Sequence, residues 1–361
     1  MTRKKKLLCV IPHSPAFDSC FPLMERLQER GVVDPLILLG PRLRAVEPRA
    51  EAAIIKAKVP YRAASILRLE LLSGLDIMRT DAVLTHSDPR AYGGKFRPRD
   101  FVTLRLNKPT VFVQHGMVQA GLHYGGPKPV WDFHAGLMLT WTPIEDPHAS
   151  YCGGTVADRL RVTGLIKTNR LALSPDLAAL DRELGAWRQR LLICHNFGFE
   201  SPLYPISAQR HAFDEWAKLA DARPDTLFIL RAHRGKSHPD NTAMVEKLIE
   251  NRPNIILSER HAGLMRMATI NDVMAVVDKV ISHPSTVVLD AVYDNKPIGV
   301  FNSTQDELAC LPQTETAADI GAFLDDPDSS QHAAPLRARY GDLSDNLDRA
   351  AQEVESHLSD L

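Results

Sequence analysis

The chain has 361 residues, more than the roughly 250 to 300 at which a single hydrophobic core stops growing, so its length predicts two domains. Hydrophobic residues make up 44% and charged residues 24%, a composition that fits a soluble globular protein and excludes a disordered or fibrous one. The 43 Lys and Arg against 44 Asp and Glu give a net charge of −1, so we expect no nucleic-acid partner.

The sequence also argues against a membrane-spanning or secreted protein. No apolar run approaches the ~18 residues of a membrane-spanning helix, and the short apolar stretch after the basic residues 3–6 has no small-residue cleavage site. The five cysteines are scattered without a CxxC pair, which indicates neither a disulfide framework nor a zinc site. We expect a cytoplasmic protein without metal or cofactor, with a weak peripheral membrane contact through residues 3–6.

The first half of the chain alternates short apolar runs with helical patterns. The runs predict strands at 7–11, 36–39, 82–85, 111–114 and 137–141. Between 20 and 31, Phe21, Met24 and Leu27 share one helical face and Gly31 ends the pattern. This alternation predicts a mostly parallel sheet with helices on both faces.

The second half repeats this rhythm. Strands are predicted at 191–195, 226–230, 255–258, 279–282 and 297–301, and helices at about 208–220, 241–250, 269–277 and 286–294. We expect an α/β protein with two doubly wound Rossmann-like domains facing across a cleft, where the strands' carboxyl ends bind ligands. The boundaries are predicted as 1–168 for the acceptor side, 169–188 for a linker, 189–325 for the donor side and 326–361 for a C-terminal helical segment.

The turn after the predicted strand 279–282 is the first candidate site. It contains Ser282, His283, Ser285 and Thr286 and leads into a helix, whose first-turn N–H groups and dipole favour an anion. These four residues are predicted to bind a phosphate of a donor. The alternative is that the hydroxyls only cap the helix.

Asp290 lies one turn further along this helix, among apolar neighbours. A buried carboxylate needs partners, and the hydroxyls of a ribose or glycerol would supply them; the alternative is a nearby Arg or backbone N–H. Asn196 and Gly198, which follow the first strand of the second domain, are candidate donor contacts.

Basic residues follow the predicted strand 226–230. Arg231 and His233, ahead of Arg234 and Lys236, are predicted to bind the donor phosphates, because cations neutralise the charge on a departing phosphate. The alternative is a solvated basic turn.

His115 follows a strand of the first domain, and Gly116 permits the tight backbone that would present its imidazole. An imidazole is a natural general base for an acceptor hydroxyl, so His115 is the predicted catalytic residue. His13, Ser14 and Gly116 are acceptor-side candidates. The histidines at 115, 123 and 134 lack an HExxH pattern, and no P-loop, GxSxG or GxGxxG motif is found, so metal, NTPase, hydrolase and dehydrogenase chemistry are disfavoured.

Three motifs together resemble the CDP-glycerol glycerophosphotransferases and related capsule-polymer transferases. They are VFVQHG, ILRAHRG, and Ser-His-Pro-Ser-Thr followed by Asp290 and Lys296-Pro297. The resemblance implies a GT-B architecture, metal-independent transfer and a nucleotide donor held by the second domain. It also implies that His115 is the base, that Arg231, His233, Ser285 and Thr286 hold phosphates, and that Asp290 binds donor hydroxyls.

The leading hypothesis is a GT-B transferase that moves a glycosyl or glycerol-phosphate group from a CDP-, CMP- or UDP-linked donor. The acceptor would be a hydroxyl of a cell-surface polysaccharide or of its lipid-linked precursor. Two alternatives stay open: a nucleotide-sugar epimerase of the hydrolysing type, and a non-catalytic scaffold that binds a nucleotide or polymer.

Overall fold

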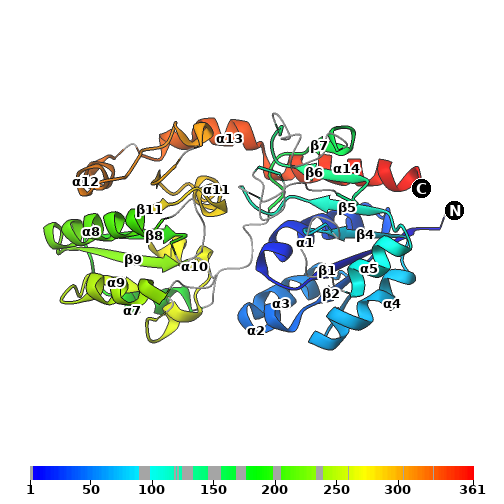
Figure 1. Ribbon diagram of the computed structural model, residues 1–361, viewed down its shortest axis with the longest axis horizontal. Helices are drawn as coiled ribbons and strands as arrows, with labels where there is room; N and C mark the ends of the chain where they lie inside the picture. The colour runs from blue at the N-terminus through cyan, green and yellow to red at the C-terminus, as the bar shows by residue number, and fades with distance from the viewer. Residues whose placement is uncertain are drawn as a thin grey trace. The chain divides into compact units, whose positions relative to one another are not determined.

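The chain forms two compact units, drawn in Figure 1. Unit 1 comprises Met1–Ala172 and Arg339–Leu361, and unit 2 comprises Leu173–Ala338. The computed structural model describes residues 3–88, 98–117, 119, 122–123, 133–144, 156–167, 176–197, 205–232, 239–258, 260–303, 305–327 and 329–361.

Unit 1 is built on a parallel sheet with the strand order β3-β2-β1-β4-β5-β6-β7. The strands are β1 Lys5–Ile11, β2 Val33–Leu39, β3 Tyr61–Ala63, β4 Ala82–Thr85, β5 Thr110–Val113, β6 Leu137–Thr140 and β7 Leu160–Val162. The helices are α1 Ser14–Glu29, α2 Pro41–Val46, α3 Pro48–Ala57, the π-helical η1 Arg68–Leu72, α4 Ser73–Met78, α5 Pro98–Arg105, the 3-10 turn η2 Ala157–Arg159 and α14 Leu343–Ser359.

The five strands predicted for this unit are confirmed within three residues at each end. Their apolar runs are buried on both sides, as parallel strands covered by helices require. The helix predicted from residue 20 begins earlier, at Ser14, because Pro15 opens it and its pattern continues through Pro22. The edge strands β3 and β7 were not predicted, since each has only three residues and is largely exposed.

Unit 2 has a second parallel sheet, with the order β10-β9-β8-β11-β12. Its strands are β8 Gln189–His195, β9 Thr226–Ala232, β10 Ile255–Leu257, β11 Lys279–Ser282 and β12 Ile298–Val300. Its helices are α7 Leu177–Leu184, α8 Ile206–Ala222, α9 Pro239–Ile249, the 3-10 turn η3 Leu264–Met267, α10 Ile270–Val276, α11 Thr286–Tyr293, η4 Asp306–Leu308, α12 Ala317–Asp325, η5 Gln331–Ala333 and α13 Ala334–Tyr340. All five strands and four helices predicted for this part of the chain are confirmed.

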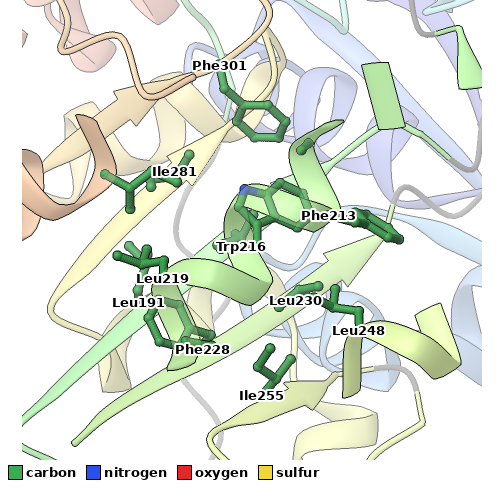
Figure 2. Packing of buried hydrophobic residues seen from close by; sticks show 14 of the residues in the cluster. Leu191, Phe213, Trp216, Leu219, Phe228, Leu230, Leu248, Ile255, Ile281 and Phe301 are labelled. Atoms are coloured by element: carbon green, nitrogen blue, oxygen red, sulfur yellow. The ribbon is translucent and has the colours of Figure 1, made fainter. Parts of the chain in front are cut away.

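The core of unit 2 lies between its sheet and α8. Figure 2 shows Phe213 and Trp216 of α8 packed near Leu191 of β8 and Leu230 of β9, and all four are buried. This aromatic and aliphatic packing fixes the strands whose carboxyl ends form the candidate site.

The C-terminal helix α14 belongs to unit 1, where it contacts α1 and β6. The side-chain amide of Asn346 donates to the carbonyl of Leu165 at 3.0 Å and to that of Tyr340 at 2.7 Å. Gly164 has a φ of +85°, and a Cβ there would lie 2.2 Å from Asn346 Oδ1, so only glycine fits.

Among the helices that the structure describes, none is long and apolar enough to cross a bilayer.

Candidate functional site

Four neighbouring strands of unit 2 end in polar residues at one edge of the sheet. Arg231 lies near the end of β9, Asn196 follows β8, His283 follows β11, and Asn302 comes two residues after β12. Because all these strands are parallel, their carboxyl ends meet at one edge, which is where ligands bind in open α/β sheets.

The helix α11 begins at this edge with a side-chain cap. Ser285 is its N-cap residue, and the Ser285 hydroxyl accepts from the N–H of Val287 at 3.3 Å. Ser282 is buried and donates to the carbonyl of His283 at 2.8 Å, with its Oγ 3.1 Å from Ser285 Oγ. Ser285 and Thr286 are only half-buried, so of these hydroxyl residues they are the ones accessible to a ligand.

His283 lies inside the turn, with no exposed surface. Its Nδ1 accepts from the backbone N–H of Asn196 at 2.8 Å, and its Nε2 lies 3.3 Å from the side-chain nitrogen of Asn302. Burial, helped by the nearby His195, lowers the pKa of His283 to about 2, so the ring is neutral at pH 7. A neutral ring in these contacts ties the turn after β8 to the residues after β12.

The rings around His283 explain its low pKa. The centroid of Phe301 lies 4.0 Å away and that of Phe197 4.5 Å away in an edge-to-face arrangement. His195, which sequence reasoning did not single out, is also buried, and burial lowers its pKa to about 4. The apolar surroundings penalise the charged form of both imidazoles.

The remaining unit 2 candidates divide into three groups. The half-buried guanidinium of Arg231 donates from Nη2 to the carbonyl of Ala268 at 3.1 Å, which fixes its orientation. Asp290 is buried within α11. His233 and Gly198 lie outside the described residues, as do Arg234 and Lys236.

Unit 1 gathers three histidines at the ends of neighbouring strands. His13 follows β1, His86 follows β4 and His115 follows β5. The Nε2 atoms of His13 and His86 are 3.3 Å apart, and the rings of His86 and His115 lie edge to face with centroids 5.2 Å apart. Burial and then the nearby His13 lower the pKa of His115 to about 4, against a smaller opposing effect of the His86 backbone. At pH 7, His115 is therefore a neutral imidazole that can accept a proton.

Two glutamines hold the backbone around His115. Gln119 accepts from the His115 N–H at 3.0 Å, while Gln114 donates to the carbonyl of Gly116 at 2.8 Å and accepts from the Trp141 N–H at 2.9 Å. These bonds fix the turn that presents the imidazole.

Sequence reasoning missed part of this cluster. His86 directly follows a predicted strand and could have been found by that position. Its neighbour Asp88 accepts from the N–H groups of His134 and Ala135 at 2.9 and 2.8 Å, which anchors a loop. Ser14 is the first residue of α1. Within the described ranges, no group of three or more His, Cys, Asp and Glu residues is arranged to ligate a metal.

No family model matches the sequence, and neither does any curated protein. Solved structures do match. The UDP-GlcNAc 2-epimerase of Neisseria meningitidis, solved with UDP-GlcNAc, is 15% identical with a TM-score of 0.64, covering 99% of this chain and 100% of its own. The Anabaena protein HepE, solved with UDP and glucose, is 16% identical with a TM-score of 0.56 and covers the same shares.

The wall teichoic acid polymerase TagF is 11% identical with a TM-score of 0.54, covering 99% of this chain and 88% of the TagF chain. At such identities these likenesses establish the fold alone. The expected fold class, two doubly wound Rossmann-like domains of the GT-B type, is confirmed.

Proposed function

We propose that the protein is an enzyme acting on a nucleotide-activated sugar, with the nucleotide bound at the carboxyl edge of unit 2. The observation that carries this proposal is the meeting of Arg231, the capped start of α11 and the ends of four parallel strands at one edge. Backbone N–H groups, hydroxyls and a guanidinium are the groups that bind a diphosphate. The UDP-GlcNAc in the Neisseria epimerase structure and the UDP in the HepE structure support this choice of ligand.

Each residue has a role in this proposal. Arg231 and His233 neutralise the phosphates, Ser285 and Thr286 donate to them, and Asp290 accepts from hydroxyls of the donor. His283 acts as a positioning residue, because its ring is buried, neutral and bonded to the Asn196 backbone. We therefore revise its expected role from a phosphate ligand to a support for the turn. Ser282 has a similar supporting role through Ser285.

We favour an epimerase. The Neisseria epimerase matches with a higher TM-score than HepE or TagF, over nearly the whole of both chains. Inversion by proton transfer needs a base that removes the proton of the carbon centre, and a proton is then returned to the opposite face, so that no atom is gained or lost overall. His115 is proposed as that base because it lies at the carboxyl edge of the unit 1 sheet, beside His13 and His86, and because its ring is neutral at pH 7.

The second candidate is a transferase, with His115 taking the proton of an acceptor hydroxyl instead. The three sequence motifs shared with the glycerophosphotransferases and the TagF fold favour it. Its acceptor would be a polysaccharide or a lipid-linked precursor, and its donor a CDP-, CMP- or UDP-linked group.

One incubation separates these activities. UDP-GlcNAc is supplied in D2O without an acceptor, and the sugar is followed by NMR. An epimerase changes the sugar and incorporates deuterium at the inverted carbon, whereas a transferase leaves it unchanged until an acceptor hydroxyl is added.

A variant tests the base. His115→Gln should lower turnover at least ~100-fold, the usual contribution of a general base, while UDP still raises the melting temperature. The matched control is His332→Gln, which changes a histidine of unit 2 whose side chain is 45% exposed and should leave turnover as in the wild type. Unchanged turnover in His115→Gln would remove this residue from the mechanism, and UDP binding with no turnover of any donor or acceptor would favour the scaffold.

A further inference from the structure

A cavity of about 480 Å³ lies at the amino edge of the unit 1 sheet, where β1 and β2 begin and α1 ends. Its polar lining consists of Arg3, Lys4, Lys6, Gln28 and Asp34, and the rest of the described lining is apolar. Pockets that bind small molecules have roughly 300 to 1,000 Å³ and combine an apolar wall with a few polar groups. We call this cavity the amino-edge pocket.

The amino-edge pocket is distinct from the histidine cluster of the same unit. The seven residues of β1 run from the pocket toward His13. At roughly 3.3 Å per residue they span about 20 Å, so a small ligand in the pocket cannot reach His13 or His115. What is inferred for this pocket therefore does not rest on the proposed function.

Two lysines supply the positive charge that an anion would meet. Lys4 and Lys6 are exposed, and within the described ranges their ammonium groups form no ion pair. Lys4 extends over the turn after α1, where its Nζ would lie 3.6 Å from a Cβ on Gly31. Arg3 is held by Asp81, whose two carboxylate oxygens each accept from Nη2 at 3.1 Å. Lys4 and Lys6 are thus the cations left for a phosphate, which lysine binds as a point charge.

Two oxygen acceptors complete the polar lining. Gln28 donates from Nε2 to the carbonyl of Lys58 at 3.0 Å, while its Oε1 is buried without a hydrogen-bond partner. A buried acceptor without a donor costs free energy, which a ligand hydroxyl would recover. The exposed Asp34 is the register partner of Lys6 across β1 and β2. A carboxylate beside the lysines accepts from hydroxyls and repels further negative charge, so the lining suits one phosphate together with hydroxyl groups.

The apolar wall of the pocket is formed by Val33, Pro35 and Pro60. Inorganic phosphate would leave this surface in water, whereas the C–H groups of a sugar ring would cover it. Cations on one side, acceptors on another and an apolar wall between them are complementary to a phosphorylated sugar.

The headgroups of a membrane are another source of phosphate, and the sequence predicted a weak membrane contact through residues 3–6. Membrane-binding basic segments carry about four to eight Lys or Arg in one cluster. Here Asp34 and Asp81 lie among the cations and reduce the local positive charge. A hollow site with mixed charge fits a small molecule better than a flat anionic surface.

We propose that the amino-edge pocket binds a phosphorylated sugar, with the phosphate between the ammonium groups of Lys4 and Lys6 and a sugar hydroxyl donating to Asp34.

The test is isothermal titration of the 361-residue chain with glucose 6-phosphate at physiological salt, with inorganic phosphate and glucose as reference ligands. Glucose 6-phosphate should bind more tightly than either reference. Lys4→Gln and Lys6→Gln should each weaken its binding about 10-fold, the lower end for a charge-assisted hydrogen bond, because both side chains are exposed. The matched control is Lys5→Gln, which removes the same charge from a side chain that does not line the pocket and should bind as the wild type does.

A second variant tests the sugar separately from the phosphate. Asp34→Ala should weaken the binding of glucose 6-phosphate about 10-fold, while inorganic phosphate binds at least as tightly as before because a repelling charge is gone.

Three results would overturn the proposal. One is no binding of glucose 6-phosphate to the wild type, and another is equal binding by the wild type, Lys4→Gln and Lys6→Gln. The third is sedimentation of the wild type with phosphatidic acid vesicles without binding of glucose 6-phosphate, which would assign the lysines to a lipid headgroup.

Discussion

Lowering the pH from 7 to about 5 should destabilise unit 2 through two buried histidines. His195 and His283 have folded pKa values of about 4 and about 2, below the ordinary 6.5 of a histidine. A histidine whose pKa is depressed on folding adds stability that is complete above 6.5 and is lost as the pH falls, because only the unfolded chain takes up the proton.

The size of this loss follows from the unfolded pKa alone. Both folded values lie below 5, so at pH 5 only the unfolded chain is protonated at these two histidines. Because pH 5 is 1.5 units below the unfolded pKa of 6.5, each histidine then contributes about 2 kcal/mol less to the free energy of unfolding, at 1.36 kcal/mol per unit. Together they remove about 4 kcal/mol, a large part of a typical stability of roughly 5 to 15 kcal/mol.

Urea unfolding of the wild type and His195→Phe at both pH values measures this effect. Phenylalanine fits the aromatic surroundings of His195, beside Phe213 and Trp216, and does not titrate. The variant should therefore lose about 2 kcal/mol less than the wild type between pH 7 and 5. His332→Gln, at a site where the side chain is 45% exposed, is the control and should lose as much as the wild type. Equal losses in the wild type and His195→Phe would refute the reasoning.

Two further predictions follow from unit 1. Gly164→Ala should lower the free energy of unfolding by at least about 2 kcal/mol. The new Cβ would displace the Asn346 side chain from its hydrogen bond to the Leu165 carbonyl, and a non-glycine residue would be strained at a φ of +85°. A melting curve that matches the wild type would contradict this prediction. If His115 is the base, kcat/KM should show no inflection between pH 6 and 8, because the pKa of His115 lies near 4; a limb centred near 6.5 would exclude it in this form.

The sequence predicted the strands where burial is continuous and failed where it is not. The run Leu7–Ile11 is recognisable because a central parallel strand is apolar on both faces, whereas Tyr61–Ala63 at the sheet edge has no such signal. Helix ends were less accurate, as the early start of α1 at Ser14 shows.

Part of the site was equally recognisable. Residues that follow parallel strands, such as Asn196, His115 and Ser285, must lie at a carboxyl edge once the strands are known. The environment of each side chain depends on packing between distant segments. Nothing in the local sequence shows that Phe301 and Phe197 enclose His283, or that the order β1-β4-β5 brings His86 next to His13.

The same limit applies to residues 66–78 of unit 1. Leu67, Leu71 and Leu75 have the spacing of a buried helical stripe, and only the fold reveals that these side chains are exposed.

The central claim is that the carboxyl edge of unit 2 binds a nucleoside diphosphate. Isothermal titration of the 361-residue chain with UDP tests this claim most directly. UDP should bind the wild type, and Arg231→Gln should weaken binding about 10- to 150-fold, the worth of a charge-assisted hydrogen bond. The control is Arg188→Gln, which changes an exposed arginine just before the amino end of β8 and should bind UDP as the wild type does. No binding of UDP, CDP or GDP, or equal UDP binding by Arg231→Gln and the wild type, would contradict the account.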